Sequence, residues 1–381
     1  MPEKRYAVKG TTLVMVDSST LPAEVKDPFL ALLDAFLTEY FSHYPELEHF
    51  TQLYVLYYDE HPGLPSDPIE WCRAAFNYGR EGTGVGLLHR ARIRFAHVNP
   101  DEILRSKRFE INIPVDTLLY FILQPELTDL RVRLTLVNLD RAPEHEVKWL
   151  LTNIKKWAVS PQTIVILKKF LTEFLDHECM HLVHVKQGEQ LFKRRESAMT
   201  RLKNFFVGRP DKSILRPFAA LRVALEQFSN SVFMEGLAHY AQKKPIPHDA
   251  AVWQKLYDDA VALCTKLAEG MTEIAAADQK TTQPENAGFN MVALATELKG
   301  ITYPVGYHMV YTLTFLPLNI PHDIYPLSRR QFFGLYEQAM QLRGKRPVLS
   351  YGTGKGIFDV EDAPIALRQA YKRLTAPPKA L

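Results

Sequence analysis

The sequence is poor in several features that would fix a class of protein at once. It has three cysteines, widely spaced and without a Cys-x-x-Cys pair, so neither a disulfide framework nor a cysteine-ligated zinc site is predicted. It lacks an apolar run of about 18 residues, which argues against a membrane-spanning helix. It shows no internal repeat of fixed period, which argues against a solenoid or a propeller.

An excess of charge of one sign is also missing. The net charge of +3 is too small to imply a nucleic-acid or membrane partner by itself. Residues Met1–Arg5 are followed by only a short apolar run, and we recognise no secretory signal there. We therefore expect a cytoplasmic protein with no membrane partner.

The most informative stretch of the chain is Phe174–His184, where His177, Glu178 and His181 form the pattern H-E-x-x-H. Positions four apart lie one above the other on a helix, so both imidazoles can reach a single ion. Glu178 follows the first histidine and lies beside that ion, where it can accept a proton from a bound water without being a ligand. The pattern predicts a catalytic metal site.

This interpretation requires a helix, and the flanking sequence predicts one. Ser160 is a favoured N-cap residue, and Pro161 suits the first helical position. Apolar residues recur at helical spacing from there into the motif: Ile164, Leu167, Phe170, Leu171, Phe174, Leu175 and Leu182.

A catalytic zinc needs a third protein ligand, and His184 is the nearest candidate. In an unbroken helix, however, His177 and His184 lie about 10 Å apart along the axis at a rise of 1.5 Å per residue. Metzincins bring a later histidine to the ion with a glycine that turns the chain, but Leu182 and Val183 favour a continuous helix here. We expect His184 to line or flank the site.

A better candidate lies in the segment Ser231–Ala241, which contains Glu235-Gly-Leu-Ala-His-Tyr240. Together with the H-E-x-x-H pattern, this segment resembles the gluzincin metallopeptidases, whose third zinc ligand is the glutamate of an E-G-[FL]-A-x-Y helix. The resemblance implies that Glu235 is the third ligand of a Zn²⁺ ion held by His177 and His181. Glu235 follows His181 by 54 residues (235 minus 181), more than in the simplest gluzincins, so Glu196 and Glu226 stay open as rival ligands.

A third segment, Tyr303–Tyr311, is similar to the Y-x-x-G segment of M1-like gluzincins, with Gly306 at the glycine. This similarity implies that Tyr303 stabilises the oxyanion of the tetrahedral intermediate, with Tyr307 and His308 as rivals for that role. The G-x-M-E-N segment with which M1 aminopeptidases bind a substrate amino terminus is absent. Aminopeptidase specificity is therefore not implied. His239 and Asp176 are candidates for groups that orient the ligands.

The predicted fold class is α+β and zincin-like. Residues 1–158 are expected to form a mixed α/β region, with strands that include Leu13–Val16 and Leu53–Tyr58. Residues 159–381 are expected to form a mainly helical catalytic region. We expect the strand Arg131–Asn138 to be the sheet edge on which an extended peptide would pair, or else an ordinary strand without a substrate role.

Two further segments suggest other functions. Gly79–Gly86 is rich in glycine, but it is not placed between a strand and a helix as a phosphate-binding loop would be, and Gly352–Gly356 lacks the full P-loop pattern. The segment 186–222 is noticeably basic, which is typical of a solvated helical face. Its alternative interpretation is a surface that attracts acidic groups or nucleic acid.

These patterns predict a zinc-dependent hydrolase that cleaves peptide or protein substrates, with Glu178 as the base. The alternative hypothesis is a non-catalytic zincin-like protein whose basic 186–222 segment binds nucleic acid or an acidic partner. The same site chemistry would also suit hydrolysis of a non-peptide amide or an ester.

Overall fold

The structure of this chain is a computed structural model that describes residues 3–61, 63–76, 95–123, 139–187, 215–277, 284–352 and 354–363. It is a mixed α+β structure with a small sheet near the amino terminus and mainly helices after it. The chain forms two compact units, Met1–Val183 and His184–Leu381. The division falls inside helix α7 (Thr172–Gln187), so the last turn of this helix belongs to the second unit.

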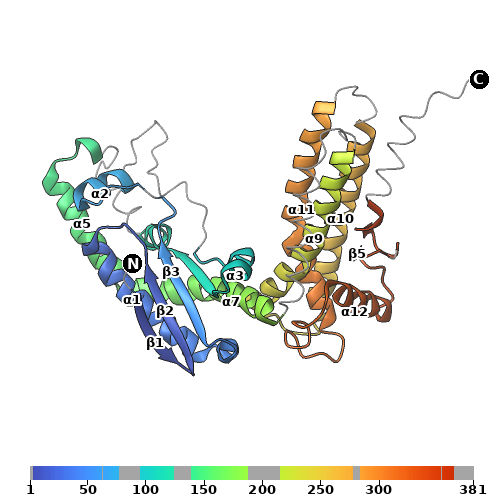
Figure 1. Ribbon diagram of the computed structural model, residues 1–381, viewed down its shortest axis with the longest axis horizontal. Coiled ribbons are helices and arrows are strands. Elements are labelled where there is room, and N and C mark those ends of the chain that lie inside the picture. The colour runs from blue at the N-terminus through green and yellow to red at the C-terminus, as the bar shows by residue number, and fades with distance from the viewer. Residues whose placement is uncertain are drawn as a thin grey trace, which may run out of the picture. The chain divides into compact units, whose positions relative to one another are not determined.

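The sheet of the first unit has the strand order β1-β2-β3-β4, and β1, β2 and β3 lie side by side in Figure 1. Strands β1 (Glu3–Val8) and β2 (Thr11–Asp17) are antiparallel, whereas β2, β3 (Gln52–Tyr58) and β4 (Glu110–Pro114) are parallel. Alternate residues of β3 are buried, because successive side chains of a strand point to opposite faces. The predicted strands Leu13–Val16 and Leu53–Tyr58 are confirmed.

One further segment extends this sheet beyond β4. His97 pairs with Asn112 of β4 in an antiparallel bridge, with reciprocal N–H to carbonyl hydrogen bonds of 2.9 Å. Val98, the next residue, is buried. The expected edge strand Arg131–Asn138 lies outside the described residues.

Helices complete the first unit. They are α1 (Ala23–His43), α2 (Pro68–Phe76), α3 (Pro100–Ser106), α5 (Glu144–Ala158) and α6 (Pro161–Ile166), with the 3₁₀ segments η1 (Pro45–His49) and η4 (Leu139–Arg141). α1 buries one apolar face, including Phe29, Leu33 and Phe41, and packs against α5 and the sheet. Apolar residues recurring at helical spacing bury such a face against a core.

The helix that contains the H-E-x-x-H pattern is built as the sequence predicts. The Ser160 side chain accepts a hydrogen bond from the Thr163 N–H, and Pro161 occupies the first turn. The chain then continues through α6, a π-helical segment η5 (Leu167–Leu171) and α7. The predicted capping and the predicted helix are both confirmed.

The second unit is built on three long helices, α9 (Leu215–Lys243), α10 (Ala250–Ala277) and α11 (Pro284–Leu313), which run alongside one another in Figure 1. α12 (Arg329–Leu342) packs on α9 and α11, and β5 (Leu349–Ser350) pairs with β6 (Phe358–Asp359). Among the helices that the structure describes, none has both the length and the apolarity needed to cross a bilayer.

Two glycines determine how α9 and α11 pack. A Cβ atom placed on Gly306 would lie 2.2 Å from the Val232 carbonyl oxygen, and one placed on Gly236 would lie 2.4 Å from the Gly306 carbonyl. Any larger residue would force the two backbones apart. The two helices therefore meet backbone to backbone at Gly236 and Gly306.

Candidate metal centre

The two histidines of the H-E-x-x-H pattern lie on one face of α7 and are almost fully buried, with 8% of His177 and 5% of His181 exposed. Their Nε2 atoms are 3.2 Å apart. Two nitrogens bound to one tetrahedral ion at about 2.0–2.1 Å each would be about 3.3 Å apart. The two imidazoles are thus spaced as ligands of a single ion.

Glu235 on α9 completes a possible ligand set. One ligand atom each from His177, His181 and Glu235 lie within 4.8 Å of one another. In the described part of the chain no other group of three His, Cys, Asp or Glu side chains meets this condition. The triad could hold a metal ion, and two imidazoles with one carboxylate suit a divalent transition metal.

Glu178 follows His177 on α7 and is not a member of the triad. Its Oε2 atom accepts a hydrogen bond of 2.7 Å from the backbone N–H of Val98. Val98 adjoins the His97–Asn112 bridge at the end of the sheet. The sheet therefore fixes the direction of the Glu178 carboxylate beside the histidines.

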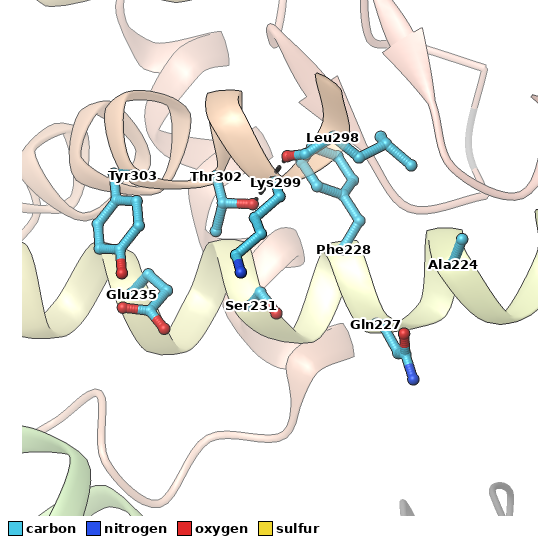
Figure 2. Close-up of a pocket in the computed structure, with 9 residues that line it drawn as sticks. All are labelled: Ala224, Gln227, Phe228, Ser231, Glu235, Leu298, Lys299, Thr302 and Tyr303. Atoms are coloured by element: carbon cyan, nitrogen blue, oxygen red, sulfur yellow. Dashed lines mark hydrogen bonds between the residues drawn. The ribbon is translucent and has the colours of Figure 1, made fainter. Parts of the chain in front are cut away.

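Tyr303 lies on α11 and is 42% exposed. It lines a pocket of about 240 Å³ together with Glu235, and Figure 2 shows its hydroxyl directed at the Glu235 side of α9. Gly306 is three residues after Tyr303, and Gly236 is next to Glu235. The close approach at the two glycines therefore sets how near Tyr303 comes to Glu235.

Among the other candidates for the third ligand, His184 and Glu226 are described and are not members of the triad. His184 is 1% exposed, and its ring packs against Phe233 with 4.6 Å between the ring centroids. Glu226 lies on α9 but is not part of the triad. Glu196 lies outside the described residues, as does most of the basic 186–222 segment.

The rivals of Tyr303 are packed in aromatic surroundings. His308 is fully buried, its Nε2 atom lies 3.2 Å from the Tyr336 hydroxyl, and burial lowers its pKa to about 3. Its position is that of a neutral core histidine. Burial also raises the pKa of Tyr307 to about 12, and its ring lies 5.2 Å from that of His239.

Contacts are described for both residues that were suggested as orienting groups, Asp176 and His239. Asp176 Oδ1 accepts a hydrogen bond of 2.9 Å from the Tyr40 hydroxyl. The His239 Nδ1 atom lies 3.1 Å from Gln242 Oε1, and its ring lies 6.1 Å from that of Tyr303. His239 therefore lies next to Tyr303, the candidate for stabilising the oxyanion.

Sequence reasoning missed two features of this centre. The first is Val98, which acts through its backbone N–H, a group that every residue except proline has. The second is the Gly236–Gly306 contact, although both glycines belong to segments that the resemblance had identified. The available signal for this contact was a glycine in each of two predicted helical segments, since glycines let two helices approach closely.

The glycine-rich segments do not form a second site in the described residues. Gly79–Gly86 lies outside them. The N–H groups of Gly352 and Gly354 are directed at the Asp359 carboxylate of their own chain, as in a loop that is fixed internally.

Comparison of the chain with protein-family models, with curated proteins and with solved structures found no match.

Proposed function

We propose that this protein is a zinc-dependent hydrolase, and specifically a metallopeptidase. The observation that supports this proposal best is the convergence of His177, His181 and Glu235 beside Glu178. His177, His181 and Glu235 would hold the ion with two imidazoles and one carboxylate, a ligand set of the kind found in catalytic zinc sites. The 3.2 Å spacing of the two Nε2 atoms fits such an ion.

A bound Zn²⁺ supplies two kinds of chemistry, since it polarises a carbonyl group and makes a water molecule acidic. The remaining steps belong to the protein. The Glu178 carboxylate takes the proton of the attacking water and passes it to the leaving amine. The Val98 N–H holds Glu178 Oε2 in place, so the carboxylate does not have to reorient during the reaction.

The Tyr303 hydroxyl donates a hydrogen bond to the oxygen of the substrate carbonyl as negative charge develops on it. Its exposure allows a substrate to reach it. A single donor of this kind is worth about 3–4 kcal/mol of transition-state stabilisation. The proposed substrate class is a peptide or protein, on the strength of the resemblance to the gluzincin metallopeptidases; Glu178 would deliver the proton that the amine leaving group of a peptide bond requires.

The metal set is tested by measuring the metal content of the purified protein, by elemental mass spectrometry after dialysis. We expect about one zinc per chain in the wild type and a marked loss in Glu235→Ala. Glu226→Ala is the matched control, because it removes a carboxylate from the same helix outside the triad. Zinc kept in Glu235→Ala and lost in Glu226→Ala would assign the third ligand to Glu226.

Catalysis is tested with the zinc-loaded protein on a peptide library. Glu178→Gln keeps all three proposed ligands and removes the base, so it should bind zinc normally and lose activity by at least about 100-fold. A zinc-free wild type, or full activity in Glu178→Gln, would refute the proposal.

A further inference from the structure

The pocket that contains Glu235 and Tyr303 continues beyond them as a groove between α9 and α11 (Figure 2). Every residue that lines it belongs to the second unit. Glu235 and Tyr303 form one end, and Phe228 and Leu298 lie toward the other end. Its volume of about 240 Å³ is below the 300–1,000 Å³ that is usual for a drug-sized ligand. The groove therefore suits one side chain or one chain terminus.

The charge of the groove comes from two residues. Of the side chains that line it, Glu235 is the one anion and Lys299 is the one cation. In the proposed function the Glu235 carboxylate is a metal ligand, so its charge is offset by the ion. The ammonium group of Lys299 then remains as the unbalanced charge of the groove, and it attracts an anionic group.

The position of Lys299 determines where an anionic group of a ligand would bind in the groove. Lys299 and Tyr303 are four residues apart on α11 and share one helical face, about 6 Å apart along the axis. Figure 2 shows the Lys299 amine reaching across the groove toward Ser231 on α9. The neighbouring Thr302 hydroxyl is hydrogen-bonded to the Leu298 carbonyl at 2.9 Å. Lys299 therefore places a positive charge about one helical turn from Tyr303, the proposed oxyanion donor.

We propose that this groove is a carboxylate-binding subsite, in which Lys299 holds a carboxylate of the substrate residue that adjoins the cleaved bond. The carboxylate belongs either to an aspartate or glutamate side chain or to the carboxyl terminus of the substrate. Phe228 and Leu298 provide apolar contact for the methylene groups beside it. This inference rests on the proposed function, because it takes the cleaved bond to lie at Glu235 and Tyr303.

The test measures binding, so that it does not depend on turnover. The zinc-loaded Glu178→Gln protein is titrated with three matched peptides, followed by fluorescence anisotropy. One peptide has an internal glutamate and an amidated carboxyl terminus, one has glutamine there with the same amide, and one has glutamine with a free carboxyl terminus. Because Lys299 is exposed, we expect the glutamate peptide or the free-acid peptide to bind about two- to fivefold more tightly than the neutral one, which also tells the two carboxylate sources apart.

Variants of Lys299 assign the effect. Lys299→Met in the same background should abolish the preference, Lys299→Arg should keep it, and Lys299→Glu should reverse it in favour of the neutral peptide. Lys255→Met on α10 is the matched control, because it removes an exposed lysine outside the groove and should leave the preference unchanged. Equal binding of the three peptides, binding of none, or a preference that survives Lys299→Met would overturn the subsite. A preference that depends on Lys299, in a wild type that cleaves no peptide, would instead support the subsite and refute the peptidase proposal.

Discussion

The contact between Gly236 and Gly306 allows a sharp test of how the second unit is built. The substitution Gly306→Ala adds one methyl group. Its carbon would lie 2.2 Å from the Val232 carbonyl oxygen and 2.8 Å from the Gly236 Cα. A carbon and a carbonyl oxygen in contact are normally about 3.3 Å apart or more. Helices α9 and α11 would have to separate by roughly 1 Å at this point.

The energetic cost follows from what is displaced. Overpacking a well-packed core costs about 1–3 kcal/mol, and the upper end applies here because the obstructing atoms are backbone and no rotamer change relieves the clash. Alanine regains about 1 kcal/mol through its higher helix propensity. We therefore expect a net loss of about 2 kcal/mol, which lowers the Tm by about 4–8 °C for a domain of about 200 residues.

The assay is thermal unfolding of the metal-free proteins, followed by circular dichroism. Gly300→Ala is the control on the same helix, because Gly300 is exposed and an added Cβ would have nothing within 4 Å. It should stabilise the protein by about 0.5–1 kcal/mol. The two substitutions thus have opposite expected signs. If Gly306→Ala were as stable as the wild type, the backbone contact between α9 and α11 would be wrong.

Three further predictions concern stability. Burial lowers the pKa of His308 to about 3 in the folded protein, so below about pH 6.5 the unfolded chain binds one proton more than the folded chain. The stability of the wild type should therefore fall with pH more steeply than that of His308→Phe, by up to about 1.4 kcal/mol per pH unit. Denaturant titrations between about pH 7 and 4 measure this difference. Ser160→Ala removes the cap that accepts from the Thr163 N–H and should cost about 1 kcal/mol in urea unfolding, with a negligible effect arguing against the cap. Burial alone would raise the pKa of Asp359, but hydrogen bonds from four backbone N–H groups lower it below its ordinary value. The ionised Asp359 carboxylate thus stabilises the fold above the pKa that it has in the unfolded chain, and this stabilisation is lost as the pH falls through the lower pKa that it has in the folded protein. Asp359→Asn should remove this acid-dependent component, and an unchanged pH profile would contradict it.

Local features of the site were predictable from the sequence. Ser160 and Pro161 mark a helix start because capping depends on adjacent residues. The spacing of His177 and His181 follows from the helical period. The richness of Leu53–Tyr58 in β-branched and aromatic residues likewise predicted β3, because such residues favour strands.

Long-range features were not predictable in the same way. No local period relates His181 to a residue in α9, so the residues alone left Glu196 and Glu226 open, and the family resemblance favoured Glu235. The structure brings a Glu235 ligand atom within 4.8 Å of the histidines. The hydrogen bond from Val98 to Glu178 joins positions 80 residues apart. Gly306 could equally have marked a turn, since a glycine in a sequence does not say whether it serves a turn or a close approach.

The π-helical segment Leu167–Leu171 determines where related chains could differ in length. A π turn accommodates one residue more than an α turn. Loss of one residue within this segment would let the helix close as a regular α-helix, with His177 and His181 still on their present face. Loss of one residue between Glu173 and His177 would rotate both imidazoles by about 100° about the helix axis. Insertions and deletions among homologues are therefore expected at Leu167–Leu171 and not in the turns that follow it.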